Sequence, residues 1–185
     1  MSSPENAGGQ WPPQTLELLD RLAAIQRSPR RYVQPIGIIG PGDGGAAECA
    51  AAFAAAGCFA RAGMSIICGG RGGVMEAASR AAAQAGGIVV GILPEEDTRA
   101  ANPYLTVAIP TGMGEMRNAI IARSSLCLLA IGGGLGTISE IALGLKWGKP
   151  VFCLHEEVQL RGATITSSTG QLIEAAAAWL VDARS

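Results

Sequence analysis

Two charged side chains stand beside glycine-rich turns, where they could act on a bound ligand. Arg117 follows Thr111-Gly112-Met113-Gly114 at the start of a predicted helix, and Glu140 follows the run Gly132-Gly133-Gly134-Leu135-Gly136-Thr137. The helix dipole disfavours a cation at a helix N-terminus, so Arg117 is better explained by an anionic partner, either a ligand or Glu140. If the protein is an enzyme, we expect Arg117 and Glu140 to be its catalytic pair.

The glycine run before Glu140 is typical of an anion site. It follows a short apolar segment, residues 126–131, which predicts a buried parallel strand, and it precedes a helix predicted over 138–146. Free N–H groups in the first turn of a helix, together with the helix dipole, favour a negative charge by ~0.3–1 kcal/mol. We therefore predict that this turn binds phosphate through Gly133, Gly134, Gly136 and Thr137.

Two further glycine turns, residues 40–45 and 69–73, also follow predicted strands. The second contains Arg71, whose guanidinium suits phosphate. The remaining residues that we predict to bind the ligand are Gly40, Gly42, Gly70, Arg71, Gly72, Gly73, Thr111 and Asn118.

Other site classes are disfavoured by the sequence. The first turn has the spacing of a dinucleotide fingerprint, but no acidic residue follows about 20 residues later, and no turn continues into the Lys-Ser or Lys-Thr of a Walker loop. No metal-ligand spacing and no GxSxG motif are present, and we interpret His155, the only histidine, as incidental rather than as a ligand contact. The remaining hypothesis is a phosphate-bearing small-molecule ligand.

The elements that must position these residues alternate between strand and helix. Such alternation predicts an α/β fold, a Rossmann-like three-layer αβα sandwich with a mostly parallel sheet of about six to seven strands. In such sheets the ligand binds beyond the carboxyl ends of the strands, where the strand order reverses. The sequence does not determine that order. Strands are expected at 35–40, 64–68, 87–93, 105–109, 126–131, 151–154 and 163–165, and helices at 15–26, 46–62, 74–85, 115–123, 138–146 and 170–183.

Composition limits the class of protein. The chain has 185 residues and is 49% hydrophobic, so we expect one domain over residues 14–185. Residues 1–13 are polar and contain Pro and Gly, and we expect this segment to be disordered. The net charge of −1 disfavours a nucleic-acid partner. We expect no membrane span and no signal peptide. Five cysteines without a CxxC motif favour reduced thiols and a cytoplasmic protein. The Ala-rich helix at 46–62 is apolar on nearly every face and should pack on the sheet or on an oligomer partner.

Taken together, three segments resemble the Lonely-Guy (LOG) superfamily, whose members also carry the label "lysine decarboxylase". The segments are Gly69-Gly70-Arg71-Gly72-Gly73-Val74-Met75, Thr111-Gly112 with Arg117-Asn118, and residues 132–140. The resemblance extends over about 36–154 and is greatest for the branch of molybdenum cofactor carrier proteins, which have an Arg-Asn pair and an all-glycine start to the last motif. It implies a homodimer or homotetramer.

The resemblance leaves two functions open. A carrier would hold the molybdenum cofactor or a nucleotide without chemistry. LOG enzymes instead hydrolyse the N-glycosidic bond of nucleoside 5′-monophosphates and require no cofactor for catalysis. Their motif Met-His-x-Arg-Lys falls on residues 114–118, where Arg117 is kept, whereas Glu115 replaces the histidine and Asn118 the lysine. Glu140 of their second motif is also kept. No pattern in the sequence supports a pyridoxal-phosphate site or lysine decarboxylation.

Overall fold

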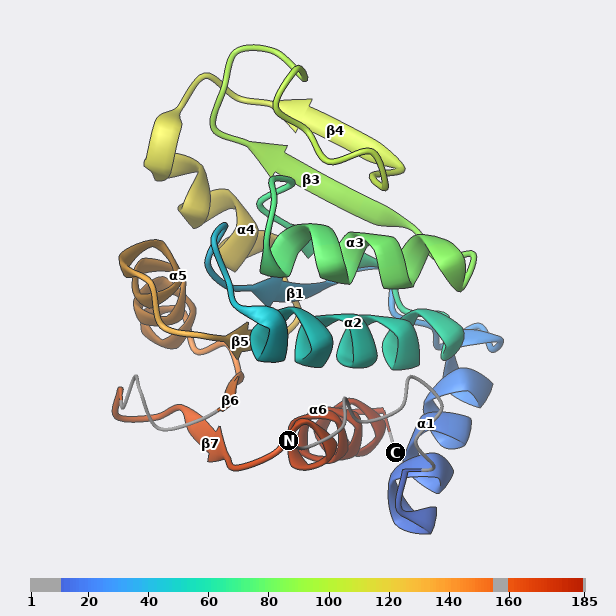
Figure 1. The fold of residues 1–185 in the computed structure, drawn as a ribbon. Helices are drawn as coiled ribbons and strands as arrows, with labels where there is room; N and C mark the ends of the chain where they lie inside the picture. The colour runs from blue at the N-terminus through green and yellow to red at the C-terminus, as the bar shows by residue number, and fades with distance from the viewer. Residues whose placement is uncertain (1–10, 155–159, 185) are drawn as a thin grey trace, which may run out of the picture.

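Short runs of Ile, Leu, Val and Ala form the strands of a single parallel sheet. The computed structural model describes residues 11–154 and 160–184, and its seven strands lie in the order β4-β3-β2-β1-β5-β6-β7 (Figure 1). The chain adds β2, β3 and β4 on one side of β1 and then returns to place β5 on the other side. The strand order therefore reverses between β1 and β5, whose carboxyl ends carry the first and third glycine turns. The strands are β1 (Ile36–Ile39), β2 (Ile66–Cys68), β3 (Val89–Leu93), β4 (Val107–Pro110), β5 (Leu128–Ile131), β6 (Val151–Leu154) and β7 (Thr164–Thr166).

Helices cover both faces of the sheet, which confirms the predicted three-layer α/β fold. One face carries α2, α3 and α6, with α1 packed against α6, and the other carries α4 and α5 (Figure 1). The Ala-rich α2 lies between α3 and α6, so its apolar faces are largely covered within the chain itself. The helices are α1 (Pro13–Gln26), α2 (Ala46–Arg61), α3 (Val74–Gln84), α4 (Asn118–Ser124), α5 (Leu135–Lys146) and α6 (Thr169–Asp182); a 3₁₀ turn, η1 (Gly114–Arg117), precedes α4.

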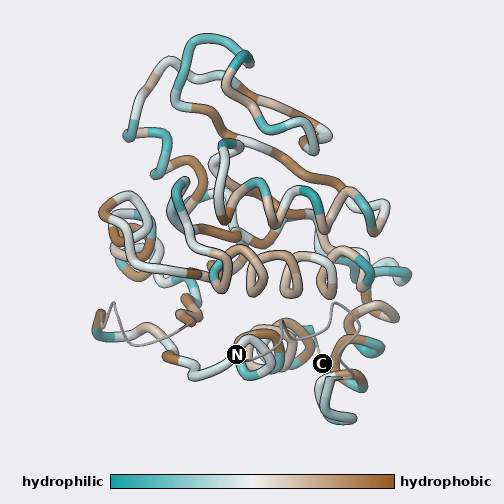
Figure 2. The backbone as a smooth tube through the Cα atoms, in the orientation of Figure 1, coloured by the Kyte–Doolittle hydropathy of each residue, from teal (hydrophilic) through white to brown (hydrophobic). Residues whose placement is uncertain are grey.

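The five central strands, β1, β2, β3, β5 and β6, are buried between the helix layers and form the core, whereas the edge strands β4 and β7 are largely exposed. Figure 2 shows hydrophobic strands and a mostly hydrophilic connection between β3 and β4. Ile38 and Ile66 are fully buried under α2 and α3, and Ile39 and Leu128 lie in the cluster under α4 and α5. Each such side chain contributes about 1.5–3 kcal/mol of hydrophobic free energy. Rigid central strands hold the glycine turns at one end of the sheet.

Several element boundaries differ from the sequence-based expectation. Helix α5 begins at Leu135 rather than residue 138, so Gly136 and Thr137 lie in its first turn and Glu140 in its second. The helix predicted over 115–123 is split into η1 and α4. Helix α1 begins at Pro13, because proline suits the first helical position, and Trp11 already packs on the core.

Part of the prediction of a disordered segment at 1–13 lies outside the described residues, since 1–10 are not among them; the same holds for His155 and for residues 155–159 of the predicted loop. Within the described part of the chain, no helix is both long enough and apolar enough to span a membrane.

Candidate functional site

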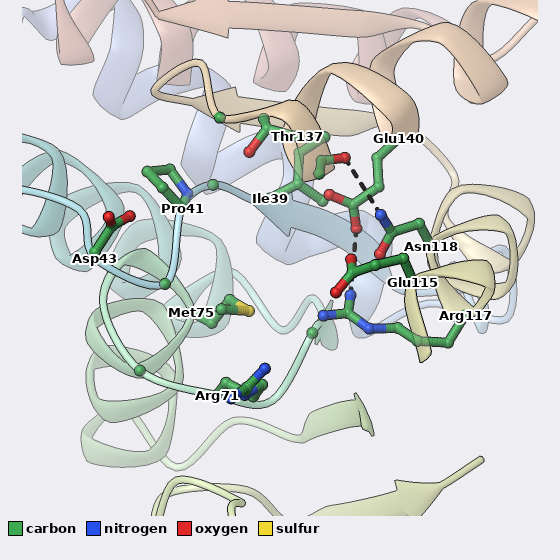
Figure 3. Close-up of a pocket in the computed structure, with 16 residues that line it drawn as sticks. Ile39, Pro41, Asp43, Arg71, Met75, Glu115, Arg117, Asn118, Thr137 and Glu140 are labelled. Atoms are coloured by element: carbon green, nitrogen blue, oxygen red, sulfur yellow. Dashed lines mark hydrogen bonds and ion pairs between the residues drawn. The ribbon is translucent and has the colours of Figure 1, made fainter. Parts of the chain in front are cut away.

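A cleft of about 440 Å³ opens at the carboxyl ends of the central strands. The first glycine turn, the second glycine turn, η1 and the start of α5 all contribute to its lining (Figure 3). This is the position at which the reversal of strand order between β1 and β5 leaves a crevice. The lining residues are Ile39, Gly40, Pro41, Gly42, Asp43, Gly69, Arg71, Gly72, Met75, Glu115, Arg117, Asn118, Gly134, Gly136, Thr137 and Glu140.

The N-terminus of α5 offers unpaired donors to this cleft. Its N-cap residue is Gly134, which has no side chain to cap the helix. Ile138 N–H donates to the Gly134 carbonyl, but the N–H groups of Leu135, Gly136 and Thr137 have no acceptor within residues 11–154 and 160–184. Three free N–H groups at the positive end of a twelve-residue helix form a site that favours an anion.

The first glycine turn leads to a helix end that already holds a carboxylate. Glu48, in the first turn of α2, accepts a hydrogen bond from Gly45 N–H at 2.7 Å. The same carboxylate lies directly against Gly132, whose φ of +85° and missing Cβ make room for it. A ligand phosphate at α2 would have to compete with Glu48, which makes α5 the better anion site.

The second glycine turn packs against the first. Val74 N–H, the first of α3, donates to the Pro41 carbonyl at 3.2 Å. Gly73 has a φ of +62°, and a Cβ there would lie 2.6 Å from the same carbonyl oxygen. The close approach of the two turns brings Arg71 and Gly72 to the cleft beside Gly42.

Arg117 and Glu140 meet at the base of the cleft (Figure 3). Arg117 Nη1 lies 3.7 Å from Glu140 Oε1, and both side chains are more than nine-tenths buried. The guanidinium lies over Gly69, where a Cβ would be 2.6 Å from both Nη atoms. The Nε atom of Arg117 is buried and has no hydrogen-bond partner in the described part of the chain. A buried, incompletely paired arginine is costly for a fold, and a ligand oxygen would relieve that cost.

Burial sets the protonation of Glu140. Desolvation raises the pKa of this carboxyl to about 8; Arg117 lowers the pKa and the nearby Glu115 raises it further. At pH 7 the carboxyl is therefore mostly neutral and can donate a hydrogen bond. The pair then carries the net positive charge of Arg117 in the cleft, which suits an anionic ligand.

Asn118 connects the two helices behind the site. Its Nδ2 donates to Ser139 Oγ at 2.8 Å and to the Gly136 carbonyl at 3.3 Å, and Ser139 Oγ donates to the same carbonyl. The side-chain amide thus fixes the first turn of α5 against α4. Asn118 also lines the cleft, and its predicted contact with the ligand stays a prediction.

The structure brings most of the predicted residues together. Those that line the cleft are Gly40, Gly42, Arg71, Gly72, Arg117, Asn118, Gly134, Gly136, Thr137 and Glu140. Gly70, Gly73, Thr111 and Gly133 are not among the lining residues. Thr111 Oγ1 donates to the Leu93 carbonyl at 2.7 Å, and Gly70, with a φ of +73°, packs against Gly91 and Leu105. These residues shape the turns around the cleft.

Sequence reasoning did not include six lining residues in the site. They are Ile39, Pro41, Asp43, Gly69, Met75 and Glu115. Pro41, Asp43 and Gly69 lie within turns whose other members were selected, so including whole turns would have found them. Met75 belongs to a segment that resembles the LOG superfamily, but its apolar side chain gave no reason to expect it at the site, which it reaches from the first turn of α3. Among the described residues, no group of three or more His, Cys, Asp or Glu side chains is arranged to hold a metal ion.

Comparison with known proteins identifies relatives over most of the chain. A model of the SLOG cluster4 family matches residues 33–179. An uncharacterised protein of Archaeoglobus fulgidus is 42% identical over 130 residues, which cover 70% of this chain and 85% of that protein.

Two solved structures are similar in both fold and sequence. The molybdenum cofactor binding protein from the phototrophic bacterium Rippkaea orientalis superposes with a TM-score of 0.74 at 36% identity, covering 80% of this chain and 98% of that one. The molybdenum cofactor carrier protein of Chlamydomonas reinhardtii superposes with a TM-score of 0.71 at 32% identity, covering 80% and 99%.

Proposed function

Since this chain belongs to the SLOG cluster4 family, we propose that its cleft binds the molybdenum cofactor and that the protein carries this cofactor without transforming it. Two similar proteins are named for binding or carrying that cofactor, and the similarity covers nearly the whole of each. A carrier needs a site that recognises both ends of its cargo and needs no reacting group.

The open N-terminus of α5 is the observation that carries the proposal. The cofactor ends in a phosphate monoester, and the three free N–H groups of Leu135, Gly136 and Thr137 are suited to such a group. Arg117 adds a buried cation whose Nε has no partner among the described residues. The residues present therefore fit an anionic group at the base of the cleft.

The other end of the cofactor is a pterin with amino and amide groups. Asp43 also lines the cleft, and its carboxylate is an acceptor for such N–H groups. It lies in the first glycine turn, across the opening from η1 and Arg117 (Figure 3). The cleft of about 440 Å³ lies within the range of small-molecule sites.

A second candidate function is hydrolysis of nucleoside 5′-monophosphates, which the Arg117–Glu140 pair favours. In that reaction Glu140 would stabilise positive charge on the ribose or position water, and both roles need an ionised carboxylate. A pKa of about 8 leaves Glu140 mostly neutral at pH 7. Desolvation therefore disfavours the ionised form that these hydrolytic roles require, and we place the carrier first.

Binding of the cofactor tests the proposal directly. The purified protein is mixed with molybdenum cofactor released from a molybdoenzyme, passed through a desalting column, and assayed for the fluorescence of the oxidised pterin. We expect the wild type to retain the cofactor and Gly136→Val to weaken binding at least about tenfold, or 1.4 kcal/mol. A Cβ at Gly136 meets no atom closer than 3.8 Å, so the variant should fold and fill the cleft.

Leu135→Val is the matched control, because Leu135 lies in the same turn, is 87% exposed and does not line the cleft. Equal binding by wild type and Gly136→Val would contradict the proposed site. In parallel, AMP is incubated with the protein at pH 7 and at pH 9, and free adenine is measured. Adenine release that is lost in Glu140→Ala would overturn the carrier proposal in favour of the hydrolase.

A further inference from the structure

The segment between β3 and β4 packs against the second glycine turn. Asn102, from this segment, is 7% exposed, and both polar atoms of its side chain are hydrogen-bonded. Its backbone N–H donates to the Gly70 carbonyl at 2.9 Å, and its Nδ2 donates to the Arg71 carbonyl at 3.2 Å. Two consecutive carbonyls of the turn are thus held by one residue that is 31 positions away from Arg71 in the sequence.

Further bonds fix Asn102 itself. Its Oδ1 accepts from Tyr104 N–H at 3.1 Å, and its Nδ2 also lies 3.3 Å from Ser79 Oγ on α3. Ser79 in turn donates to the Met75 carbonyl at 2.8 Å. Asn102 therefore joins the β3–β4 segment, the second turn and α3 in one buried polar network, in which each donor has a defined acceptor.

The same segment also holds the side chain of Arg71. Glu95 Oε1 lies 3.4 Å from Arg71 Nε. Neither Nη atom of Arg71 has a hydrogen-bond partner within the described residues, and Arg71 lines the cleft. A guanidinium held through Nε leaves its outer fork free to bind two oxygens of a phosphate.

We propose that the segment from residue 94 to 104 supports the binding site, with Asn102 and Glu95 as positioning residues that present the Arg71 fork to an anionic group of the ligand. This inference rests on the proposed function, because it deepens the description of the same cleft. Asn102 sets the backbone of the turn and Glu95 sets the direction of the guanidinium. Neither residue lines the cleft.

A double-mutant cycle between Asn102 and Arg71 tests this inference. The dissociation constant of the molybdenum cofactor is measured for the wild type, Arg71→Ala, Asn102→Ala and the double variant. We expect Arg71→Ala to weaken binding roughly 10- to 150-fold, as for a charge-assisted hydrogen bond. Asn102→Ala should weaken binding roughly two- to tenfold alone. In the Arg71→Ala background it should change binding less than about twofold, because its effect passes through Arg71.

Glu95→Gln and Thr106→Val complete the set. Glu95→Gln leaves the backbone hydrogen bonds of the segment intact and should also lose its effect when Arg71 is absent, so the inference stays testable if Asn102→Ala does not fold. Thr106 lies two residues beyond this segment and its Oγ1 accepts from Val89 N–H at 3.0 Å, so Thr106→Val should bind the cofactor like the wild type.

The outcomes separate the inference from the proposed function. Wild-type protein that binds no cofactor overturns the proposed function and the inference with it. Wild-type binding with fully additive effects of Asn102→Ala and Arg71→Ala overturns the inference alone, since a merely structural role of Asn102 would weaken binding equally in both backgrounds. Amide hydrogen exchange of residues 69–73 should be faster in Asn102→Ala and unchanged in Thr106→Val.

Discussion

At the scale of single residues, burial of the Glu140 carboxyl lowers the stability of the folded protein. This side chain is 5% exposed, its ion pair with Arg117 is as long as 3.7 Å, and the charge of Glu115 disfavours its ionised form. A buried acid with a strongly raised pKa in a cleft is a common mark of a functional site. If Glu140 only contributed to the fold, glutamine could replace it without loss of stability.

Replacing Glu140 with glutamine should stabilise the protein, by an amount that depends on pH. Burial raises the pKa of Glu140 from 4.5 to about 8, so folding takes up a proton between these two values. The contribution of Glu140 to the free energy of unfolding is therefore most favourable below pH 4.5 and is lost as pH rises to 8. We expect Glu140→Gln to be more stable than the wild type by about 1–3 kcal/mol at pH 8 and by much less near pH 5.

Urea denaturation at both pH values measures this difference. Glu115→Gln is the control, because Glu115 is exposed and its charge reaches Glu140 only through space. Its effect on stability should be much smaller. Identical unfolding curves for the wild type and Glu140→Gln at pH 5 and pH 8 would show that Glu140 is ionised in the folded protein.

At the scale of elements, the sequence predicts the strand–turn–helix units well and their exact ends less well. Apolar runs bounded by glycines located the five central strands, because a strand buried on both faces must be continuously hydrophobic, whereas the edge strands β4 and β7 are largely exposed. The start of α5 was missed by three residues, since Gly136 disfavours a helix by propensity although it lies in the first turn of α5. Glu48 caps the N-terminus of α2, and its carboxylate fits there only because Gly132 has no side chain. Gly132 is 84 positions away in the sequence, so no local pattern predicts this contact.

The contact between Gly132 and Glu48 can be tested by one added methyl group. Gly132 has a φ of +85°, and a Cβ there would collide with the Glu48 carboxylate. Gly132→Ala should therefore destabilise the protein by about 1–3 kcal/mol through backbone strain and loss of this contact. Urea denaturation of the variant measures the loss as a lower midpoint with an unchanged slope.

Gly134→Ala provides the matched control in the same turn. Gly134 has a φ of −64°, and a Cβ there would lie 3.6 Å from Pro41 Cβ, which is an ordinary contact. Its unfolding midpoint should stay close to that of the wild type. Equal destabilisation by both substitutions would mean that the turn is sensitive to any side chain and not to the contact with Glu48.

At the scale of the whole molecule, the site exists because the strand order reverses between β1 and β5. The sequence placed three glycine turns at strand ends, and parallel strands bring such ends to one edge of the sheet. Which turns meet depends on pairings of β1 with β2 and β5, between chain segments far apart in sequence. The contribution of residues 94–104 was missed for the same reason, because Asn102 reaches Arg71 only after β3 and β4 have added to the sheet.

Because the cleft joins the first turn, the second turn and α5, a bound ligand should stabilise the molecule as a unit. A ligand that binds only the folded state adds about 2.7 kcal/mol at one hundred times its dissociation constant. For a chain of 185 residues, this corresponds to a rise in Tm of roughly 5–10 °C. Thermal unfolding followed by circular dichroism, with increasing molybdenum cofactor, should show this rise in the wild type and in Leu135→Val. Gly136→Val should show little rise at the same concentrations, because its side chain fills the cleft without loosening the fold. An equal rise in Gly136→Val would mean that the stabilising ligand binds elsewhere on the protein.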